Sequence, residues 1–397
     1  MIGVQKMKIF LDALSRKSTV SVGTIAYIIS DMQIINKKFS NCEFYMLSSN
    51  LEVENEYISK LPYNIKLIKR SSSEFVTIFQ IRKILKEVDV VVSSWGDGYI
   101  SSPPHKLFRK TFILKKRNVP MILFTSSIGP FNGGIKDYIA YIGLKKFDFI
   151  SIRDIVTYNY LKKFSFKKLR LVHDSAFVLE STSDDNIDKI LSNAGLLDNK
   201  FIGLNISVLL YNKFKNYNKR YEIIMAEMVN WLKKEFNIAV LLIPHQIFPG
   251  SYQYTKEQYR STGGDDRYAI EQVMENMIDN KDVYHLSDYY SPSDLKGVIK
   301  RSEIFIGGRM HSVIAAISTC TPALIMQYSH KASGMMRMLD MEQFVWDIAE
   351  DQELLKSKIR RLWKEKNEIR TKLKKEIPSI LEEIYNLADE IEKCLQK

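Results

Sequence analysis

The stretch from Ile304 to Lys331, IFIGGRMHSVIAAISTCTPALIMQYSHK, holds the residue types best suited to chemistry in this chain. An apolar run ends at two glycines, and Arg309 and His311 follow with one residue between them. The next segment, HSVIAAIS, has the apolar spacing of a helix. The first N–H groups of a helix attract anions, a guanidinium binds phosphate or carboxylate through two bonds, and an imidazole moves protons near neutral pH. The stretch predicts an anion site beside a titratable group, formed by Gly307, Gly308, Arg309, Met310, His311 and Ser312.

Basic residues also follow other apolar runs of strand length. His245 ends LLIPH, Arg153 ends FISIR, and Lys331 follows PALIMQYSH. Arg153 could bind phosphate or carboxylate, or it could pair with a neighbouring acid. His245 is either a structural histidine or a proton carrier. Lys331 could add positive charge to the site of Arg309.

Two further loops contain glycine next to polar residues. In SSWGDGY, Gly96 and Gly98 flank Asp97, and they would let the backbone turn tightly beside a ligand. Asp97 could take a proton from a hydroxyl or form a turn that caps a helix. In FTSSIGPF, the backbone N–H groups near Ser127 and Gly129 could bind an anion, or the segment could be an ordinary exit from a strand.

The elements that must position these residues alternate along the chain. Short runs that are apolar at nearly every position, such as VDVVVSSW, VPMILFTSS and IAVLLIPH, predict strands buried on both faces. Longer segments with helical spacing, such as YEIIMAEMVNWLKKEF, separate them. This alternation predicts an α/β fold with parallel sheets, whose ligands bind beyond the carboxyl ends of the strands.

A chain of 397 residues is too long for one ordinary core. The polar segment ESTSDDNIDKILSNAGLLDNK separates two sets of alternating strands and helices, as a linker with one short helix would. We therefore expect two Rossmann-like domains that face a cleft, at residues 1–185 and 196–347, followed by a charged helical tail at 348–397. Pro378 is expected to interrupt or start a helix in that tail.

Composition narrows the functional classes. The formal net charge of +12 favours an anionic ligand or surface, while the spread of lysine and arginine along the chain argues against a nucleic-acid partner. Three widely separated cysteines, no signal-peptide pattern and no long apolar window predict a cytoplasmic protein, with peripheral contact at the inner face of the membrane left open. No metal-ligand spacing, P-loop or GxSxG motif occurs, so neither a metal nor a cofactor is expected.

Several motifs, in this order, resemble the polysaccharide pyruvyl transferase family. They are SSWGDGY, SSIGPF, SIRDIVTYNYL, HDSAFVL, IPHQ and GGRMHSVIAAISTCTPALIMQYSHKASGM. The last of them resembles the family's Gly-x-Arg-x-His signature, which is followed by a helix and a Tyr-x-x-Lys segment. The resemblance extends over roughly Lys8 to Asp347. It implies a fold similar to glycosyltransferase-B enzymes, with acceptor binding in the first domain and donor binding in the second.

The resemblance also implies a reaction. The donor would be phosphoenolpyruvate, and the acceptor would be a sugar, glycan or lipid-linked oligosaccharide of the cell surface. The product would be a pyruvate ketal, with phosphate released. Arg309 and the start of its helix would hold the donor together with Arg153 and Lys331. His311 would act as general acid and base, and His245 or Asp97 would assist at the acceptor.

Two other functions compete with this interpretation. A glycosyltransferase of the same fold would use a nucleotide sugar and could bind its ribose through Glu271 or Glu275, although their spacing equally suits a solvent-facing helix. A non-catalytic protein could bind anionic glycans or membranes through the basic tail.

Overall fold

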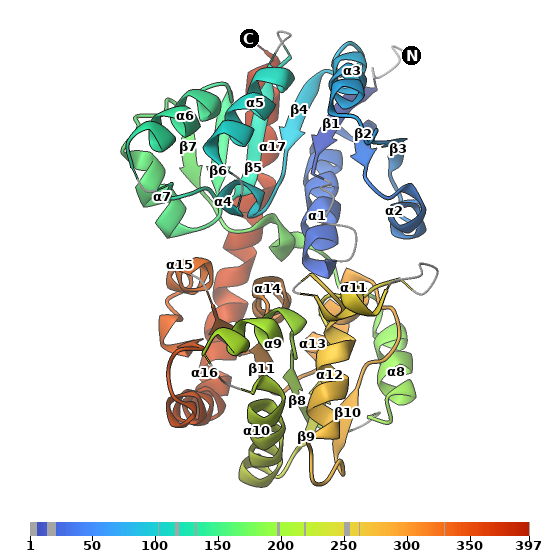
Figure 1. The fold of residues 1–397 in the computed structure, drawn as a ribbon, viewed down its shortest axis with the longest axis vertical. Helices are drawn as coiled ribbons and strands as arrows, with labels where there is room; N and C mark the ends of the chain where they lie inside the picture. The colour runs from blue at the N-terminus through green and yellow to red at the C-terminus, as the bar shows by residue number, and fades with distance from the viewer. Residues whose placement is uncertain are drawn as a thin grey trace. The chain divides into compact units, whose positions relative to one another are not determined.

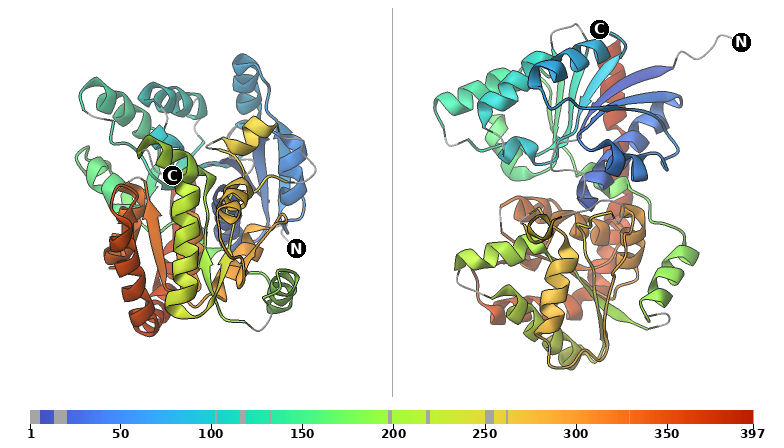
Figure 2. Two further views of the ribbon diagram at one scale, coloured as in Figure 1. Left: turned by 60° about the horizontal axis from the view of Figure 1, so that its bottom comes forward. Right: turned by 45° about the vertical axis from the view of Figure 1, so that its right-hand side comes forward.

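The structure is a computed structural model that describes residues 6–13, 21–101, 103–115, 119–131, 133–196, 199–217, 220–249, 255–261, 263–328 and 330–396. The chain divides into two compact units. Unit 1 comprises the described residues of Met1–Thr19, Tyr27–Leu179 and Ser379–Lys397, and unit 2 those of Val20–Ala26 and Glu180–Pro378. Each unit contains one parallel sheet with helices packed on it (Figures 1 and 2).

The sheet of unit 1 has seven strands in the order β3-β2-β1-β4-β5-β6-β7. The chain moves outward from β1 through β2 to β3 and then crosses to β4, so the order reverses between β1 and β4. The strands are β1 (Met7–Asp12), β2 (Cys42–Ser48), β3 (Asn64–Lys69), β4 (Val90–Ser93), β5 (Met121–Ser126), β6 (Phe149–Ile152) and β7 (Leu169–Leu171). The helices of this part of the chain are α1 (Val22–Phe39), α2 (Leu51–Ile58), α3 (Glu74–Ile84), α4 (Gly98–Ser101), α5 (Pro104–Leu114), α6 (Ile135–Leu144) and α7 (Ile155–Lys162), followed by the 3-10 turn η1 (Ser175–Val178).

The apolar strands of unit 1 form its core. Every residue of β4, β5 and β6 is buried, as expected for strands that helices cover on both faces. One face of the sheet, which includes Phe10, Leu123 and Ile150, packs against Ile84 of α3 and Leu107 of α5. This packing fixes α3 and α5 close together beside the reversal point of the sheet.

The sheet of unit 2 has six strands in the order β10-β9-β8-β11-β12-β13, and its strand order reverses between β8 and β11. The strands are β8 (Phe201–Leu204), β9 (Ala239–Leu242), β10 (Val283–His285), β11 (Phe305–Gly307), β12 (Ala323–Gln327) and β13 (Val345–Asp347). The helices are α8 (Asp184–Asn193), α9 (Val208–Phe214), α10 (Tyr221–Phe236), α11 (Lys256–Arg260), α12 (Asp266–Glu275), α13 (Pro292–Lys300), α14 (Met310–Ser318), α15 (His330–Met338) and α16 (Gln352–Tyr385), with 3-10 turns η2 (Lys215–Tyr217) and η3 (Glu342–Phe344). The predicted fold class of two Rossmann-like domains with a C-terminal helical tail is thus confirmed.

The prediction for Pro378 was wrong. Pro378 lies inside α16, which continues for 34 residues. A proline removes one helical hydrogen bond, but Leu373, Ile377, Ile380 and Ile384 are all buried along the same helix. Burial of each such side chain contributes about 1.5–3 kcal/mol, so the apolar stripe keeps the segment helical.

The tail does not form a separate part of the molecule. Its residues up to Pro378 belong to unit 2, and those from Ser379 onward, including α17 (Leu387–Leu395), belong to unit 1. Polar contacts attach this last segment to unit 1, from Lys38 to Asp389 and from His173 to Glu383. Figure 1 shows α17 in red among the elements of unit 1. The division of the chain into units therefore differs from the expected one, in which residues 348–397 formed a separate tail.

Candidate functional site

The start of α14 lies where the strand order of unit 2 reverses. Asn205 follows β8 and Gly308 follows β11, so both stand at the carboxyl ends of adjacent strands. Ligands of open α/β sheets bind at such a point. The side chain of Asn205 accepts a hydrogen bond from the Gly308 N–H, which lies 3.2 Å from its Oδ1. This bond fixes the turn that leads into the helix.

The two glycines of the turn are required by close packing. A side chain at Gly307 would place its Cβ 2.4 Å from Cγ2 of Val313. At Gly308 the corresponding distance to Cδ1 of Leu210 is 2.9 Å. A larger residue at Gly307 would displace the first turn of α14, and one at Gly308 would push against α9. Gly307 and Gly308 therefore shape the turn through their small size.

Arg309 is the N-cap residue of α14, and its guanidinium pairs with Asp266 at the start of α12. Nε lies 2.8 Å from Oδ2 and Nη2 lies 2.7 Å from Oδ1. Burial opposes the charge of Arg309, but the Asp266 carboxylate outweighs it and raises the pKa of Arg309. The arginine therefore stays charged, and its two bonds leave Nη1 for another partner.

Asp266 joins three segments of the site. It is fully buried, and besides Arg309 it accepts hydrogen bonds from the backbone N–H groups of Val208 and His245, each at 2.9 Å. These contacts connect the start of α9, the loop after β9 and the start of α14. The sequence motifs did not predict this role of Asp266, because its partners lie 21 to 58 residues away in the sequence.

His245 is buried beside Arg309 and His311. Burial lowers the pKa of His245 well below its usual value, and the positive charges of His311 and Arg309 lower it further. His245 is therefore neutral at neutral pH. Because the charges of His311 and Arg309 act on the pKa of His245, these three basic side chains lie close together.

His311 is half-buried in the first turn of α14, where Gly23 packs against its ring. A Cβ at Gly23 would lie 2.5 Å from Nδ1 of His311. Gly23 belongs to the first turn of α1, and Ser21 just before it forms an isolated antiparallel bridge with Gln246. Gly23 therefore packs closely against the imidazole, a contact that the sequence motifs did not predict.

Two further residues of the predicted anion site, Met310 and Ser312, lie on the first turn of α14. Met310 is the first residue of α14, and the Ser312 hydroxyl donates to the backbone oxygen of Arg309 at 2.7 Å. Lys331 belongs to α15, but its side chain lies outside the described part of the structure.

Arg153 has a different environment from the one expected. It belongs to unit 1, is almost fully buried, and donates from Nη1 to Asp174 at 2.6 Å and from Nε to Ser127 at 3.1 Å. The neighbouring Asp154 caps α7 by accepting from Thr157. Against the effect of burial, its charge adds to those of Asp174 and Asp97 in raising the pKa of Arg153. These contacts hold Arg153 in the interior of unit 1, and its part in ligand binding stays a prediction.

The loop after β5, for which an anion site and an ordinary strand exit were both open, has two of its amides bonded within the protein. The N–H of Ser127 donates to the backbone oxygen of Gly96 at 2.8 Å, and the N–H of Ile128 donates to the Thr157 hydroxyl at 3.2 Å. These amides are therefore satisfied within the protein. Gly129 lies in the same loop with a positive φ of 53°.

The GDG loop of unit 1 has a compact backbone and an exposed acid. Gly96 adopts a positive φ of 52°, which favours glycine, and a Cβ at Gly98 would meet the ring of Trp95 at 2.7 Å. Asp97 between them is exposed to solvent, and its charge helps to raise the pKa of Arg153. Asp97 is thus accessible to a ligand of unit 1.

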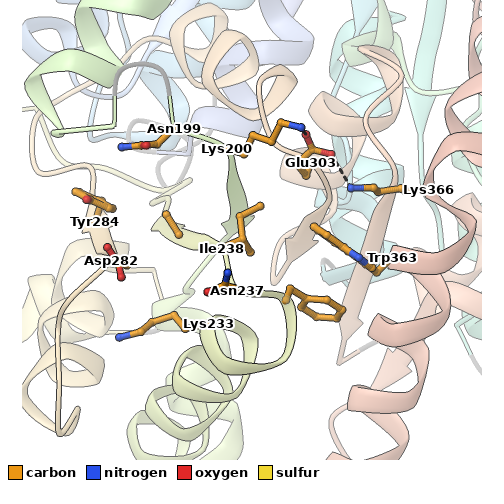
Figure 3. A pocket seen from close by; sticks show the side chains of 12 residues that line it. Asn199, Lys200, Lys233, Asn237, Ile238, Asp282, Tyr284, Glu303, Trp363 and Lys366 are labelled. Atoms are coloured by element: carbon orange, nitrogen blue, oxygen red, sulfur yellow. Dashed lines mark hydrogen bonds and ion pairs between the residues drawn. The ribbon is translucent and has the colours of Figure 1, made fainter.

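A pocket of about 510 Å³ in unit 2 lies at the opposite, amino-terminal edge of the sheet (Figure 3). Lys200, Lys233, Asp282, Glu303 and Lys366 contribute its charges. Glu303 pairs with Lys366 at 2.7 Å and with Lys200 at 3.8 Å, so much of this charge is compensated. Because this pocket lies away from the carboxyl ends of the strands and its charges pair with one another, the site at Arg309 is the better candidate for binding a ligand.

Among the described residues, no group of three or more His, Cys, Asp or Glu side chains could hold a metal ion. In the same part of the chain, no helix combines the length and the apolar character needed to cross a membrane.

Comparisons with known proteins agree with the sequence motifs. The family model described as polysaccharide pyruvyl transferase matches residues 32–330. The amylovoran biosynthesis protein AmsJ of Erwinia amylovora is 21% identical over 267 residues, which cover 66% of this chain and 62% of that protein. The match thus spans less than two thirds of that curated relative.

Solved structures show the same fold at low sequence identity. The UDP-GlcNAc 2-epimerase of Methanocaldococcus jannaschii has a TM-score of 0.60 and 11% identity, covering 90% of this chain and 93% of that one. A glycosyltransferase from Rickettsia africae has a TM-score of 0.59 and 13% identity, covering 97% and 99%. ADP-heptose LPS heptosyltransferase II of E. coli has a TM-score of 0.50 and 11% identity, covering 92% and 99%. These similarities confirm the glycosyltransferase-B-like fold.

Proposed function

The chain belongs to the polysaccharide pyruvyl transferase family, and on that premise we propose that it transfers the pyruvyl group of phosphoenolpyruvate to a sugar of a cell-surface polysaccharide or its precursor. The predictions of the family and of a transferase enzyme are confirmed by the match over residues 32–330. The donor, the ketal product and the roles of individual residues are the proposal. One observation carries it: a permanently charged arginine at the N-cap of α14, beside two histidines, where the strand order reverses.

Phosphoenolpyruvate suits the charges of this site. It is small and carries several negative charges, so its binding needs cations and helix-end N–H groups. Arg309 supplies Nη1 and a charge that Asp266 holds in place. The N–H of Met310, at the first position of α14, is one of the helix-end donors that α14 itself leaves without a partner. Arg309 and Met310 would bind the phosphate or the carboxylate of the donor.

The reaction requires balanced proton movements. Two acceptor hydroxyls attack C2 of phosphoenolpyruvate and form two C–O bonds, while the bond between C2 and the phosphate oxygen breaks. One proton is added to C3, which becomes a methyl group, and the hydroxyls lose two protons in all. The second of these protons leaves with phosphate or passes to solvent. At least one positioned acid–base group is therefore needed.

His311 is the residue that we assign to this proton transfer. It lies two residues after Arg309 on the first turn of α14, with its ring held by Gly23. His245 is kept neutral by burial and by the adjacent positive charges, so it can accept a proton from a hydroxyl. Asp97 of unit 1 remains a second proposed base for the acceptor. Asp174 and Ser127 bind Nη1 and Nε of Arg153 inside unit 1, so we assign this arginine a supporting role there.

The nucleotide-sugar alternative has less support in the chain itself. Glu271 and Glu275 are exposed on α12, and Glu275 accepts a hydrogen bond from Gln272 on the same helix. This agrees with a solvent-facing helix. The epimerase and glycosyltransferase structures share only the fold with this chain, since their identities are 11–13%.

Ligand-dependent thermal unfolding followed by a phosphate-release assay tests the proposal. Phosphoenolpyruvate should raise the unfolding temperature, whereas UDP-sugars alone should not. Phosphate release should require both phosphoenolpyruvate and a glycan acceptor. Stabilisation by a UDP-sugar alone, together with no response to phosphoenolpyruvate, would favour the glycosyltransferase instead.

A further inference from the structure

Helices α3, α5 and α6 form one layer on the sheet of unit 1, and Figure 1 labels all three. α5 packs against α3 and against α6. Their inward side chains, among them Ile84 and Leu107, belong to the same core as Leu123 of β5. We define the α3–α5–α6 face as the solvent-facing side of residues 74–84, 104–114 and 135–146. This face belongs to unit 1, whereas the start of α14 belongs to unit 2.

The α3–α5–α6 face exposes an unusual share of large apolar side chains. Among the described residues, twelve such side chains are exposed, and six of them lie on these helices. The helices hold only 11, 11 and 10 of the 397 residues, so the six are strongly concentrated. They are Phe75, Val76, Phe79, Phe112, Ile135 and Tyr138. Phe75 and Ile135 are 70% and 78% exposed. Exposed apolar side chains gathered in this way mark a surface that contacts a partner or a membrane.

Positively charged side chains surround these rings. The three helices contain six lysine and arginine residues and two acids, and Lys145 and Lys146 follow α6 directly. Nζ of Lys146 lies 4.5 Å from the centre of the Phe112 ring, and the guanidinium carbon of Arg82 lies 5.7 Å from that of Phe79. A partner that covers the rings therefore also meets several positive charges.

Acidic side chains compensate only part of this charge. Glu74 pairs with Arg109, and Lys110 pairs with Asp12 at 2.7 Å. Three other lysines of the face are exposed, and none of them forms an ion pair with an acid in the part of the chain that the structure describes: Lys83, Lys106 and Lys136. The α3–α5–α6 face is therefore both apolar and positively charged.

The charged tail, which offers another basic surface, lacks this combination. Several cations of α16 pair with acids, as Arg361 does with Glu365 at 2.8 Å. Among the described residues of the tail, the exposed large apolar side chains are Leu354 and Leu395, at 39% and 38%. The face of unit 1 is thus better suited than the tail to a partner that is both apolar and anionic.

We propose that the α3–α5–α6 face binds the surface of a membrane that contains anionic lipids. The exposed rings enter the boundary between headgroups and acyl chains, and the lysines contact the lipid phosphates. A symmetric contact with a second copy of the chain would bring the same lysines of both copies together, so the charge of the face favours the lipid surface. The helices contact the membrane from one side only, because their inward side chains remain in the core of unit 1. The inference is independent of the proposed reaction, since it uses none of the residues assigned to that reaction.

Co-sedimentation of the full-length protein with lipid vesicles tests the inference. Vesicles of phosphatidylcholine and phosphatidylglycerol in equal amounts are compared with vesicles of phosphatidylcholine alone. The protein should bind the anionic vesicles about tenfold or more tightly, and added salt should weaken that binding.

Paired variants separate the face from the rest of the protein. Phe75→Ser with Phe79→Ser should weaken binding to anionic vesicles about tenfold or more, and Lys83→Gln with Lys136→Gln should do so roughly tenfold. The matched controls replace exposed residues elsewhere: Ile278→Ser, and Lys374→Gln with Lys375→Gln on α16. Both controls should bind as the unmodified protein does. Because every replaced side chain is exposed, all variants should keep the unfolding temperature of the unmodified protein.

Other outcomes would overturn the inference. Equal binding to both kinds of vesicle would remove the role of the lysines, and unchanged binding of both face variants would remove the role of the face. An equal loss in the control on α16 would assign membrane binding to the tail or to total charge. Sedimentation velocity provides the last test: a dimer that Phe75→Ser with Phe79→Ser converts to a monomer would show that the face binds a second copy of the chain instead.

Discussion

Replacing Arg309 by lysine tests the contact of Arg309 with the donor while keeping the ion pair that stabilises the site. Lysine keeps the positive charge that compensates the buried Asp266. Its single nitrogen cannot reproduce the bonds that Nε and Nη2 make at 2.8 and 2.7 Å and also reach a ligand. Arg309→Ala would be less informative, because it would leave Asp266 buried without a counter-charge.

The expected loss follows from one missing charged hydrogen bond. Such a bond is worth about 1.5–3 kcal/mol, which corresponds to a roughly 10- to 150-fold weaker binding of phosphoenolpyruvate. Arg267→Lys is the matched control. Arg267 forms the same type of pair with the adjacent buried Asp265, from Nε at 3.0 Å and from Nη2 at 2.7 Å. Both variants should lose about 1–2 kcal/mol of unfolding free energy, and only Arg309→Lys should lose donor affinity.

Isothermal titration with phosphoenolpyruvate and urea unfolding provide the two measurements. If Arg309→Lys binds the donor as tightly as the unmodified protein, Arg309 is not the anchor. If Arg267→Lys loses as much affinity as Arg309→Lys, the effect comes from general loosening of unit 2.

Three further predictions concern groups around the two reversal points. Gly23→Ala places a methyl group 2.5 Å from Nδ1 of His311, so turnover should fall about 10- to 100-fold while donor affinity changes little, as measured by phosphate release and titration. Because the pKa of His245 is lowered, its imidazole takes up a proton below pH 6.5 only in the unfolded chain. The unmodified protein should therefore lose about 1 kcal/mol of unfolding free energy between pH 6.5 and 5.5 relative to His245→Gln. Burial raises the pKa of Asp31 from 3.8 to about 7, so its contribution to stability is present at pH 4 and lost as the pH rises to 7; Asp31→Asn should gain stability relative to the unmodified protein over that range.

Each of these predictions can fail clearly. Full turnover of Gly23→Ala would mean that the position of His311 does not matter for the reaction. Parallel pH profiles of unfolding free energy for the unmodified protein and His245→Gln, or for the unmodified protein and Asp31→Asn, would show that the pKa of the replaced group is not shifted by folding.

The order of elements could be predicted from the sequence because each is marked locally. VVVS and AVLL form the expected buried strands β4 and β9, and YEIIMAEMVNWLKKEF forms α10. The Gly-Gly turn places Arg309 at the start of a helix as expected. The prediction for Pro378 was wrong because the loss of a helical hydrogen bond at proline can be judged from the sequence alone. The side-chain burial that offsets this loss depends on the tertiary structure.

The partners of the charged residues could not be predicted in the same way. Arg309 pairs with Asp266, 43 residues earlier, and Arg153 pairs with Asp174 instead of its neighbour Asp154. Gly23 contacts His311, although Tyr27–Leu179 of unit 1 lie between them in the sequence. One sequence identifies residues at strand ends, but which of them meet depends on strand order. The sheet order of unit 2 brings the loops after β8, β9 and β11 together.

A structure of the protein with phosphoenolpyruvate bound tests the central claim most directly. We expect a phosphate or carboxylate oxygen of the donor about 3 Å from Nη1 of Arg309, with the His311 ring next to C3. A donor bound elsewhere in the molecule, with Arg309 contacting only Asp266, would contradict the account.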